Sequence, residues 1–155
     1  MSDRLSQYVT LAEAIKSDTA VRLQIDNLPT ADIRLNMEHV AKNVFDRVRA
    51  HFNVPIAITS FYRSYARSKA IGGSNTSQHC FGEAIDIDGD KLGGVTNSAI
   101  FHYIKDNLDF DQLIWEFGTA NEPDWVHVSL KRSLNRRQVL RAQKNGSKTV
   151  YVAYR

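Results

Sequence analysis

Hydrophobic residues recur at helical spacing in two stretches of the chain. The first stretch predicts a helix with Asn36 as its N-cap and an end near residues 51–53, just before Pro55. Its apolar face consists of Met37, Val40, Ala41, Val44, Phe45 and Val48. The second stretch predicts a helix with Asn97 or Ser98 as its cap. Its apolar face consists of Ile100, Phe101, Ile104 and Leu108. Shorter helices are expected at residues 65–71, stopped by Gly72 and Gly73, and at residues 136–144.

Short runs of β-branched and aromatic residues predict the strands. They lie at residues 56–61, 84–87, 112–117, 125–130 and 149–154. A loop at residues 118–124 joins the third and fourth runs. Strands that arrive singly or in hairpins, with helices between them, favour the α+β class. We therefore expect a small antiparallel sheet with flanking helices.

Length and composition limit the class of protein. The 155 residues are 43% hydrophobic and 24% charged, and they contain neither a linker nor an internal repeat, so we expect one domain over residues 1–155. No run of 18 apolar residues predicts a membrane span, and the first residues lack the pattern of a secretory signal. The single cysteine, Cys80, excludes an internal disulfide and a multi-thiolate zinc site.

The charges are unevenly distributed along the chain. The net charge is +3, yet residues 128–155 hold eight Lys or Arg and no acid. Arg136, Arg137 and Arg141 would lie near one side of the predicted terminal helix. This basic end is either a solvated helix face or a binding surface for a polyanionic wall or outer-membrane surface. The known nucleic-acid-binding patterns are missing from the sequence, so no nucleic-acid partner is expected.

Two short motifs carry residues suited to catalysis. The first is S-x-H-x-x-G-x-A-x-D over residues 77–86, and the second is D-W-V-H over residues 124–127. They supply two imidazoles and a carboxylate, the three N/O ligands of a catalytic zinc site with an open position for water. The candidate ligands are His79, Asp86 and His127. A further carboxylate must move the proton of that water, and Asp124 is the candidate, with Glu122 as its competitor.

Two other interpretations of these segments fail on spacing. Residues 86–90 match the D-x-D-x-D start of a calcium loop, but Lys91 and Asn97 occupy the positions where such a loop needs Gly and Glu. Cys80 could serve as a nucleophile with a histidine. However, it directly follows His79, and neighbours in an extended chain point to opposite sides.

The two motifs in this order resemble the zinc D-alanyl-D-alanine carboxypeptidase and peptidoglycan endopeptidase family, the M15-like peptidases. Within it, they are most similar to bacteriophage endolysins that act as L-alanyl-D-glutamate peptidases. Residues 60–64 (SFYRS), 72–74 (GGS), 111–114 (DQLI) and 135–138 (NRRQ) are similar as well. The resemblance covers about residues 55–142. It implies a fold like that of hedgehog and the D,D-peptidases.

The resemblance also implies roles for individual residues. His79, Asp86 and His127 become ligands of Zn²⁺, and Asp124 becomes the general base. Arg63 becomes the residue that holds a substrate carboxylate or carbonyl and stabilises the oxyanion.

Three further residues are expected to support the site. Ser77 and Trp125 are expected to contact substrate. Glu116, in an apolar strand, is either a partner of the metal ligands or a buried structural carboxylate.

The resemblance predicts a zinc metallopeptidase that hydrolyses the stem peptides of peptidoglycan. It would act as an L-Ala-D-Glu endopeptidase or a D-Ala-D-Ala carboxypeptidase. The expected setting is a monomeric phage endolysin or virion-associated lysin that passes from the host cytoplasm to the cell wall or periplasm. The alternative is a catalytically inactive, metal-stabilised module that binds the wall or another polyanion.

Overall fold

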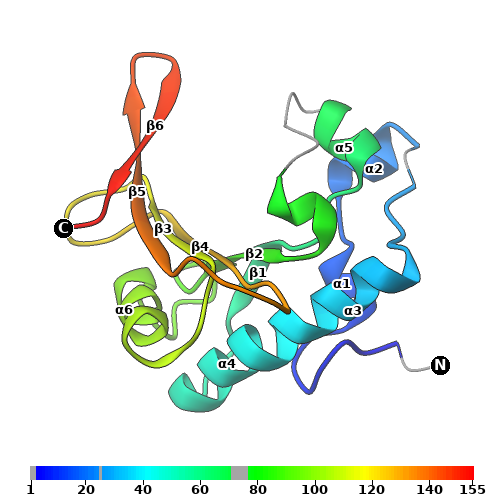
Figure 1. Ribbon diagram of the computed structural model, residues 1–155, viewed down its shortest axis with the longest axis horizontal. Coiled ribbons are helices and arrows are strands. Elements are labelled where there is room, and N and C mark those ends of the chain that lie inside the picture. Colours follow the sequence, from blue (N-terminus) through cyan, green and yellow to red (C-terminus); the bar gives the residue numbers. More distant parts are fainter. Residues whose placement is uncertain (1–2, 25, 71–76) are drawn as a thin grey trace.

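A six-stranded sheet in the order β1-β2-β4-β3-β5-β6 forms the centre of the computed structural model (Figure 1). The structure describes residues 3–24, 26–70 and 77–155. The strands are β1 Ala57–Ser60, β2 Ala84–Asp88, β3 Gln112–Glu116, β4 Trp125–Ser129, β5 Gln138–Asn145 and β6 Lys148–Ala153. Neighbouring strands are antiparallel except for β3 and β5, which are parallel. The α+β class is therefore confirmed, and the expected sheet is antiparallel except at this one pair.

Helices α3, α4 and α6 pack on one face of the sheet. The bounds of the helices are α1 Leu11–Ala14, α2 Asp18–Arg22, α3 Ala31–Val40, α4 Asp46–Phe52, α5 Tyr65–Ala70 and α6 Asn97–Asn107, with a π-helical turn η1 at Ala41–Phe45 and a 3₁₀ turn η2 at Gln78–Phe81. The first three segments after residue 30 are consecutive, so α3, η1 and α4 form one long helical stretch (Figure 1). The predicted helix at residues 65–71 is confirmed as α5, whereas its predicted stop at Gly72 and Gly73 lies outside the described residues.

The two predicted N-caps were wrong. Thr30 caps α3, and its hydroxyl accepts a hydrogen bond from the backbone N–H of Ile33. Thr96 caps α6 in the same way. Each helix starts with polar or exposed residues that do not belong to its apolar face, so the hydrophobic repeat alone marks the start too late. Asn36 instead lies inside α3, where its side chain donates to the Phe81 carbonyl.

Alternation along the strands separates the core from the opposite face of the sheet. Ile85 and Ile87 of β2 and Val126 and Val128 of β4 are fully buried in the core, against α3, η1 and α6. The intervening residues of these strands point away from the helices. Asp86, which lies directly opposite His127 in the β2–β4 pair, is therefore on the face that the helices leave open.

The predicted helix at residues 136–144 was also wrong. This segment is β5, which pairs with β3 on one side and with β6 on the other. Together β5 and β6 form a hairpin that projects from the body of the protein (orange to red in Figure 1). Arg, Gln, Ala and Lys have good intrinsic helix propensity, but two flanking strands supply backbone hydrogen bonds that outweigh it.

The three arginines of this segment do not form one cationic side. Arg136 pairs with Asp111, and the Arg137 guanidinium donates to the backbone carbonyls of residues 105 and 108. The Arg141 guanidinium lies 4.7 Å from the centroid of the Trp115 ring. Each guanidinium is thus held by a different part of the fold. Binding of the basic end to a polyanion stays a prediction, but these arginines are structural residues and reversing their charges would test the fold rather than the surface.

Within the described residues, every helix is too short or too polar to cross a lipid bilayer.

Candidate metal centre

Two histidines and an aspartate converge on the open face of the sheet. His79 comes from the turn η2, Asp86 from β2 and His127 from β4. One ligand atom from each residue lies within 4.8 Å of the other two. The structure thus brings together the three residues that the sequence predicts as metal ligands, although they are separated by up to 48 positions along the chain.

The turn η2 fixes the orientation of His79. His79 is 3% exposed, and the Nδ1 of its imidazole lies 2.7 Å from the backbone carbonyl of Phe61. A carbonyl only accepts, so Nδ1 carries the hydrogen and Nε2 keeps a free lone pair. Ser77 caps the turn, and its hydroxyl accepts the backbone N–H of His79 at 3.3 Å. This Ser77 contact therefore positions a candidate ligand.

Gly82 closes the same turn in the left-handed region, with φ of 71°. A Cβ at this position would lie 2.7 Å from Cγ of Met37 and 2.8 Å from the carbonyl oxygen of Ile33. Only glycine accommodates both the backbone conformation and the close contact with α3. The turn that carries His79 is thereby packed directly on the helical layer.

Asp86 is the centre of the cluster. Its Oδ1 lies 2.9 Å from Nδ1 of His127 and 3.4 Å from Nε2 of His79. Burial would raise the pKa of this carboxyl, but the two imidazoles beside it outweigh burial and hold the pKa well below its ordinary value. Burial lowers the pKa of His79, which favours its neutral form. An ionised carboxylate and neutral imidazoles are the protonation states that bind a metal, and the N, N, O donor set fits Zn²⁺.

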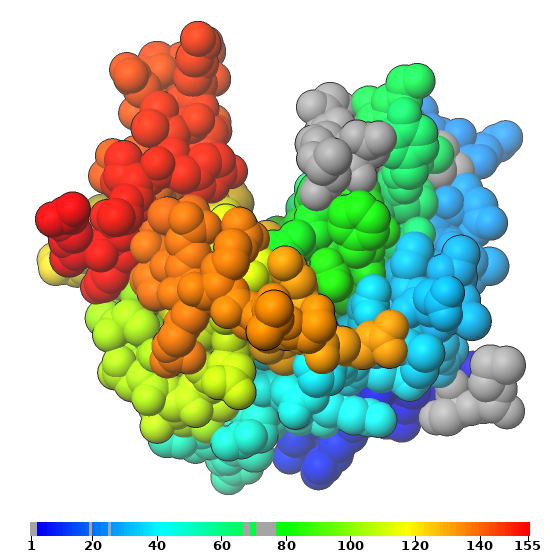
Figure 2. Space-filling view, in the orientation of Figure 1, coloured from blue at the N-terminus to red at the C-terminus, as the bar shows by residue number. Residues whose placement is uncertain are grey.

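The cluster lies at the base of a groove with a volume of about 1080 Å³. Figure 2 shows the hollow between the β5–β6 hairpin (orange to red) and the segment around η2 (bright green). Towards the start of β3 and β5, the groove is lined by Gln78, Gln112, Arg136 and Gln138. Towards the tip of the hairpin, it is lined by Lys144, Thr149 and Tyr151. The groove therefore extends beyond the metal cluster in both directions.

Glu116 is the second buried carboxyl of the groove. It ends β3 on the same face as His127, because it pairs with Trp125 while Ile114 pairs with His127. Its side chain is largely withdrawn from solvent, and burial raises its pKa to about 7, with Asp86 adding to the rise and His127 and Arg63 opposing it. A carboxyl with this pKa can take up and release a proton near neutral pH.

The structure does not bring the predicted general base together with the metal ligands. Asp124 is exposed and is not among the residues that line the groove. Because Trp125 and His127 share the groove face, the residue before Trp125 begins on the other side. The competitor Glu122 is also elsewhere, since its carboxylate accepts the backbone N–H of Ser98 at the start of α6.

Arg63 and Trp125 both line the groove, as the sequence predicts for substrate-contacting residues. The Arg63 guanidinium lies 3.7 Å from Oδ2 of Asp86, and its backbone N–H donates to the carbonyl of His79. Trp125 is half-buried, with its ring centroid 5.5 Å from that of Phe117. A guanidinium beside the metal cluster can bind or stabilise a negatively charged oxygen of a substrate.

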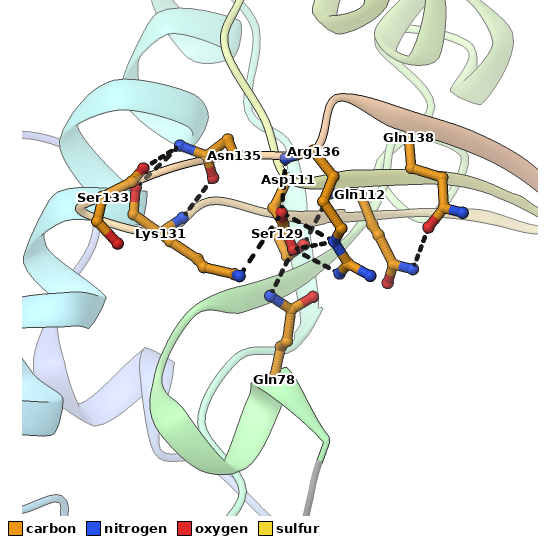
Figure 3. Close-up of polar contacts among 9 residues, drawn as sticks. All are labelled: Gln78, Asp111, Gln112, Ser129, Lys131, Ser133, Asn135, Arg136 and Gln138. Carbon is orange, nitrogen blue, oxygen red and sulfur yellow. Dashed lines mark hydrogen bonds and ion pairs between the residues drawn. The ribbon is translucent and has the colours of Figure 1, made fainter.

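Sequence reasoning missed a polar brace around Asp111 (Figure 3). This carboxylate is fully buried and accepts hydrogen bonds from Nε and a terminal nitrogen of Arg136, from the Arg136 backbone N–H, and from Nε2 of Gln78 at 2.9 Å. Burial would raise the pKa of Asp111, but these donors outweigh it and bring the pKa to about 2. Since Gln78 precedes His79, the brace ties the ligand-bearing turn to the entry of β5.

Replacing Asp111 with Ala is expected to destabilise the fold by about 2–4 kcal/mol, because Gln78 and the Arg136 backbone lose a buried acceptor. The depressed pKa stabilises the folded state above pH 4, and this contribution is lost as the pH falls from about 4 to about 2. Urea unfolding at pH 7 and at pH 3 measures both effects. Asp111→Asn is the matched variant, and its deficit should shrink as the pH is lowered. A deficit that does not change with pH would contradict the assignment.

Comparison with family models places the chain in a peptidase family. The model described as Peptidase M15 matches residues 7–129, which include the whole metal cluster and Glu116. The search of curated proteins returned no match. The matched segment ends with β4, so β5 and β6 lie beyond it.

Proposed function

This chain belongs to the peptidase M15 family, and we propose that it is a zinc-dependent peptidase that hydrolyses amide bonds in the stem peptides of bacterial peptidoglycan. The observation that carries the proposal is the convergence of His79, Asp86 and His127 at the base of an open groove, with the buried carboxyl of Glu116 on the same face. The family consists of peptidases, and the donor set is the one that catalytic zinc uses.

The residues of the groove have distinct roles in this proposal. His79, Asp86 and His127 would hold a zinc ion, which would supply Lewis acidity and lower the pKa of a bound water. Glu116 accepts the proton of the attacking water on its carboxylate and then donates it to the nitrogen of the leaving amine. Arg63 stabilises the negative charge that develops on the oxygen of the cleaved amide. Asp124 is replaced in the role of base because it lies outside the groove.

The shape of the groove favours cleavage within a peptide. The lining continues on both sides of the metal cluster, towards Gln112 and Gln138 on one side and towards Lys144 and Thr149 on the other. Such a groove accommodates substrate residues before and after the cleaved bond. We therefore propose the L-Ala-D-Glu endopeptidase activity rather than release of a terminal D-alanine. The similarity of the motifs to those of phage endolysins supports a role as a wall-degrading lysin.

Digestion of purified peptidoglycan tests the proposal. The zinc-loaded protein should release fragments with new L-alanine C-termini, detected by mass spectrometry, and removal of zinc with a chelator should stop the release. Free D-alanine would identify a carboxypeptidase instead. Sedimentation of the protein with peptidoglycan without any hydrolysis would contradict the peptidase and indicate the wall-binding module that the sequence leaves as the alternative.

A further inference from the structure

The cations of the groove differ in their partners. Arg63 lies 3.7 Å from a carboxylate oxygen of Asp86, and Arg136 lies 2.6 Å from one of Asp111. Lys144 also lines the groove, but in the described part of the chain no carboxylate lies within 4.0 Å of its ammonium. Among the described cations that line the groove, Lys144 therefore differs from Arg63 and Arg136 because its charge is not balanced by an ion pair.

The Lys144 side chain is nevertheless held in place. Its Nζ donates a hydrogen bond to the hydroxyl of Thr149 at 3.2 Å and lies 5.0 Å from the centroid of the Phe117 ring. Phe117 adopts φ of 56°, a left-handed conformation that costs a non-glycine residue about 1 kcal/mol or more. This conformation comes directly after Glu116, and it brings the aromatic ring beneath the ammonium. Ring and hydroxyl leave donor capacity on the ammonium, which has three N–H bonds.

Lys144 lies beyond Glu116 along the groove. In the parallel β3–β5 pair, Ala142 lies opposite Glu116, and Lys144 is two residues further along β5 on the same face. Two strand residues span about 7 Å. Leu140 lies in the row of Ile114 and the metal ligand His127, four residues before Lys144, so an extended substrate centred on the metal cluster would bring a group a few residues from the cleaved bond towards this ammonium.

We propose that Lys144 is a specificity-determining residue that binds a carboxylate of the substrate near the cleaved bond. The inference rests on the proposed function, because it takes the substrate to be a stem peptide. Such a peptide offers carboxylates of the same chemistry at two places, the α-carboxylate of its γ-linked D-glutamate and its C-terminus. Charge complementarity and position favour a carboxylate over a neutral amide at this point of the groove.

Binding of matched peptides tests this role without relying on turnover. Two synthetic stem peptides, one with the free carboxylates and one with the D-glutamate α-carboxylate amidated, are titrated calorimetrically into the zinc-loaded Glu116→Gln protein. A third peptide carries a C-terminal amide. We expect about tenfold tighter binding of the free acid than of one of the two amides, as a charge-assisted hydrogen bond provides. The amide that loses affinity identifies the carboxylate that Lys144 binds.

Lys144→Met in the same background should bind the acid and the amides equally, and Lys144→Arg should restore part of the preference. Lys148→Met is the matched control, because it removes the same charge from the same hairpin outside the groove lining, and it should keep the full preference. An unchanged preference in Lys144→Met, with the fold confirmed by circular dichroism, or no preference in the parent protein, would overturn the inference. Failure of the proposed function would show separately, as absence of hydrolysis of peptidoglycan by the zinc-loaded wild type.

Discussion

Replacing Glu116 with Gln is expected to slow peptide hydrolysis by about 10²- to 10⁴-fold while leaving the zinc content unchanged. The amide cannot accept the proton of the attacking water, whereas its size and its place at the end of β3 remain the same. The measurement is kcat on a defined stem peptide, together with elemental analysis of the purified variant.

Asp124→Asn is the matched control for this substitution. Asp124 is exposed and outside the groove, so we expect less than about a threefold change in turnover, within the range of ordinary surface substitutions. Near-normal turnover of Glu116→Gln together with an inactive Asp124→Asn would return the role of base to Asp124, as the sequence motif predicts.

Although Glu116→Gln is expected to slow hydrolysis, it should increase the stability of the metal-free protein at alkaline pH. Burial raises the pKa of Glu116 from 4.5 to about 7, so the folded state holds this proton more tightly than the unfolded chain does. The metal-free wild type is therefore expected to lose stability as the pH rises from about 4.5 to about 7, and the loss is complete above that. Glu116→Gln lacks this loss, and at pH 8 it should unfold at a higher urea concentration than the wild type. Equal midpoints at pH 8 would show that the carboxyl is better solvated than its burial indicates.

Replacing either His79 or His127 with Ala is expected to remove both zinc and activity. Each variant keeps only two of the three ligands, and a site with two ligands does not retain the ion through purification. Elemental analysis should find less than a tenth of an equivalent of zinc per chain. In addition, zinc should raise the melting temperature of the wild type and have little effect on that of either variant, because a metal that binds the folded state stabilises it.

His39→Ala provides the control for these two variants. His39 is in α3, where its ring lies against Asn43 and away from the groove. It should keep a full equivalent of zinc. Full zinc occupancy in both the His79 and His127 variants would contradict the metal centre.

The metal ligands could be predicted from the sequence because the family motifs contain them at fixed spacing. The role of Glu116 depends on a contact between strands. Its pairing with Trp125 sets it on the face of His127, and no local pattern encodes that register. The sequence motif instead pointed to Asp124 as the general base, because Asp124 is closer to His127 along the chain than Glu116 is. Asp111 was missed for the same reason, since its partners Gln78 and Arg136 are 33 and 25 positions away from it in the sequence.

The secondary structure likewise contains elements that the local sequence predicts and one that depends on tertiary pairing. The strands at residues 56–61, 84–87, 112–117 and 125–130 are confirmed, since short β-branched runs between turns have few other solutions. Residues 136–144 carry side chains that favour a helix, yet residues 138–145 form a strand because β3 and β6 pair with them on either side. Tertiary pairing of this kind cannot be read from local propensity.

The parallel pairing of β5 with β3 also separates two stretches of sequence within one groove. The metal ligands and Glu116 lie inside residues 7–129, which the family model matches, whereas Lys144, Thr149 and Tyr151 come from the hairpin beyond them. The reactive centre and the opposing wall therefore come from separate stretches of the chain. Exchange of the hairpin alone, with β3 kept as its docking edge, offers a route to peptidases that share one chemistry and select different peptides.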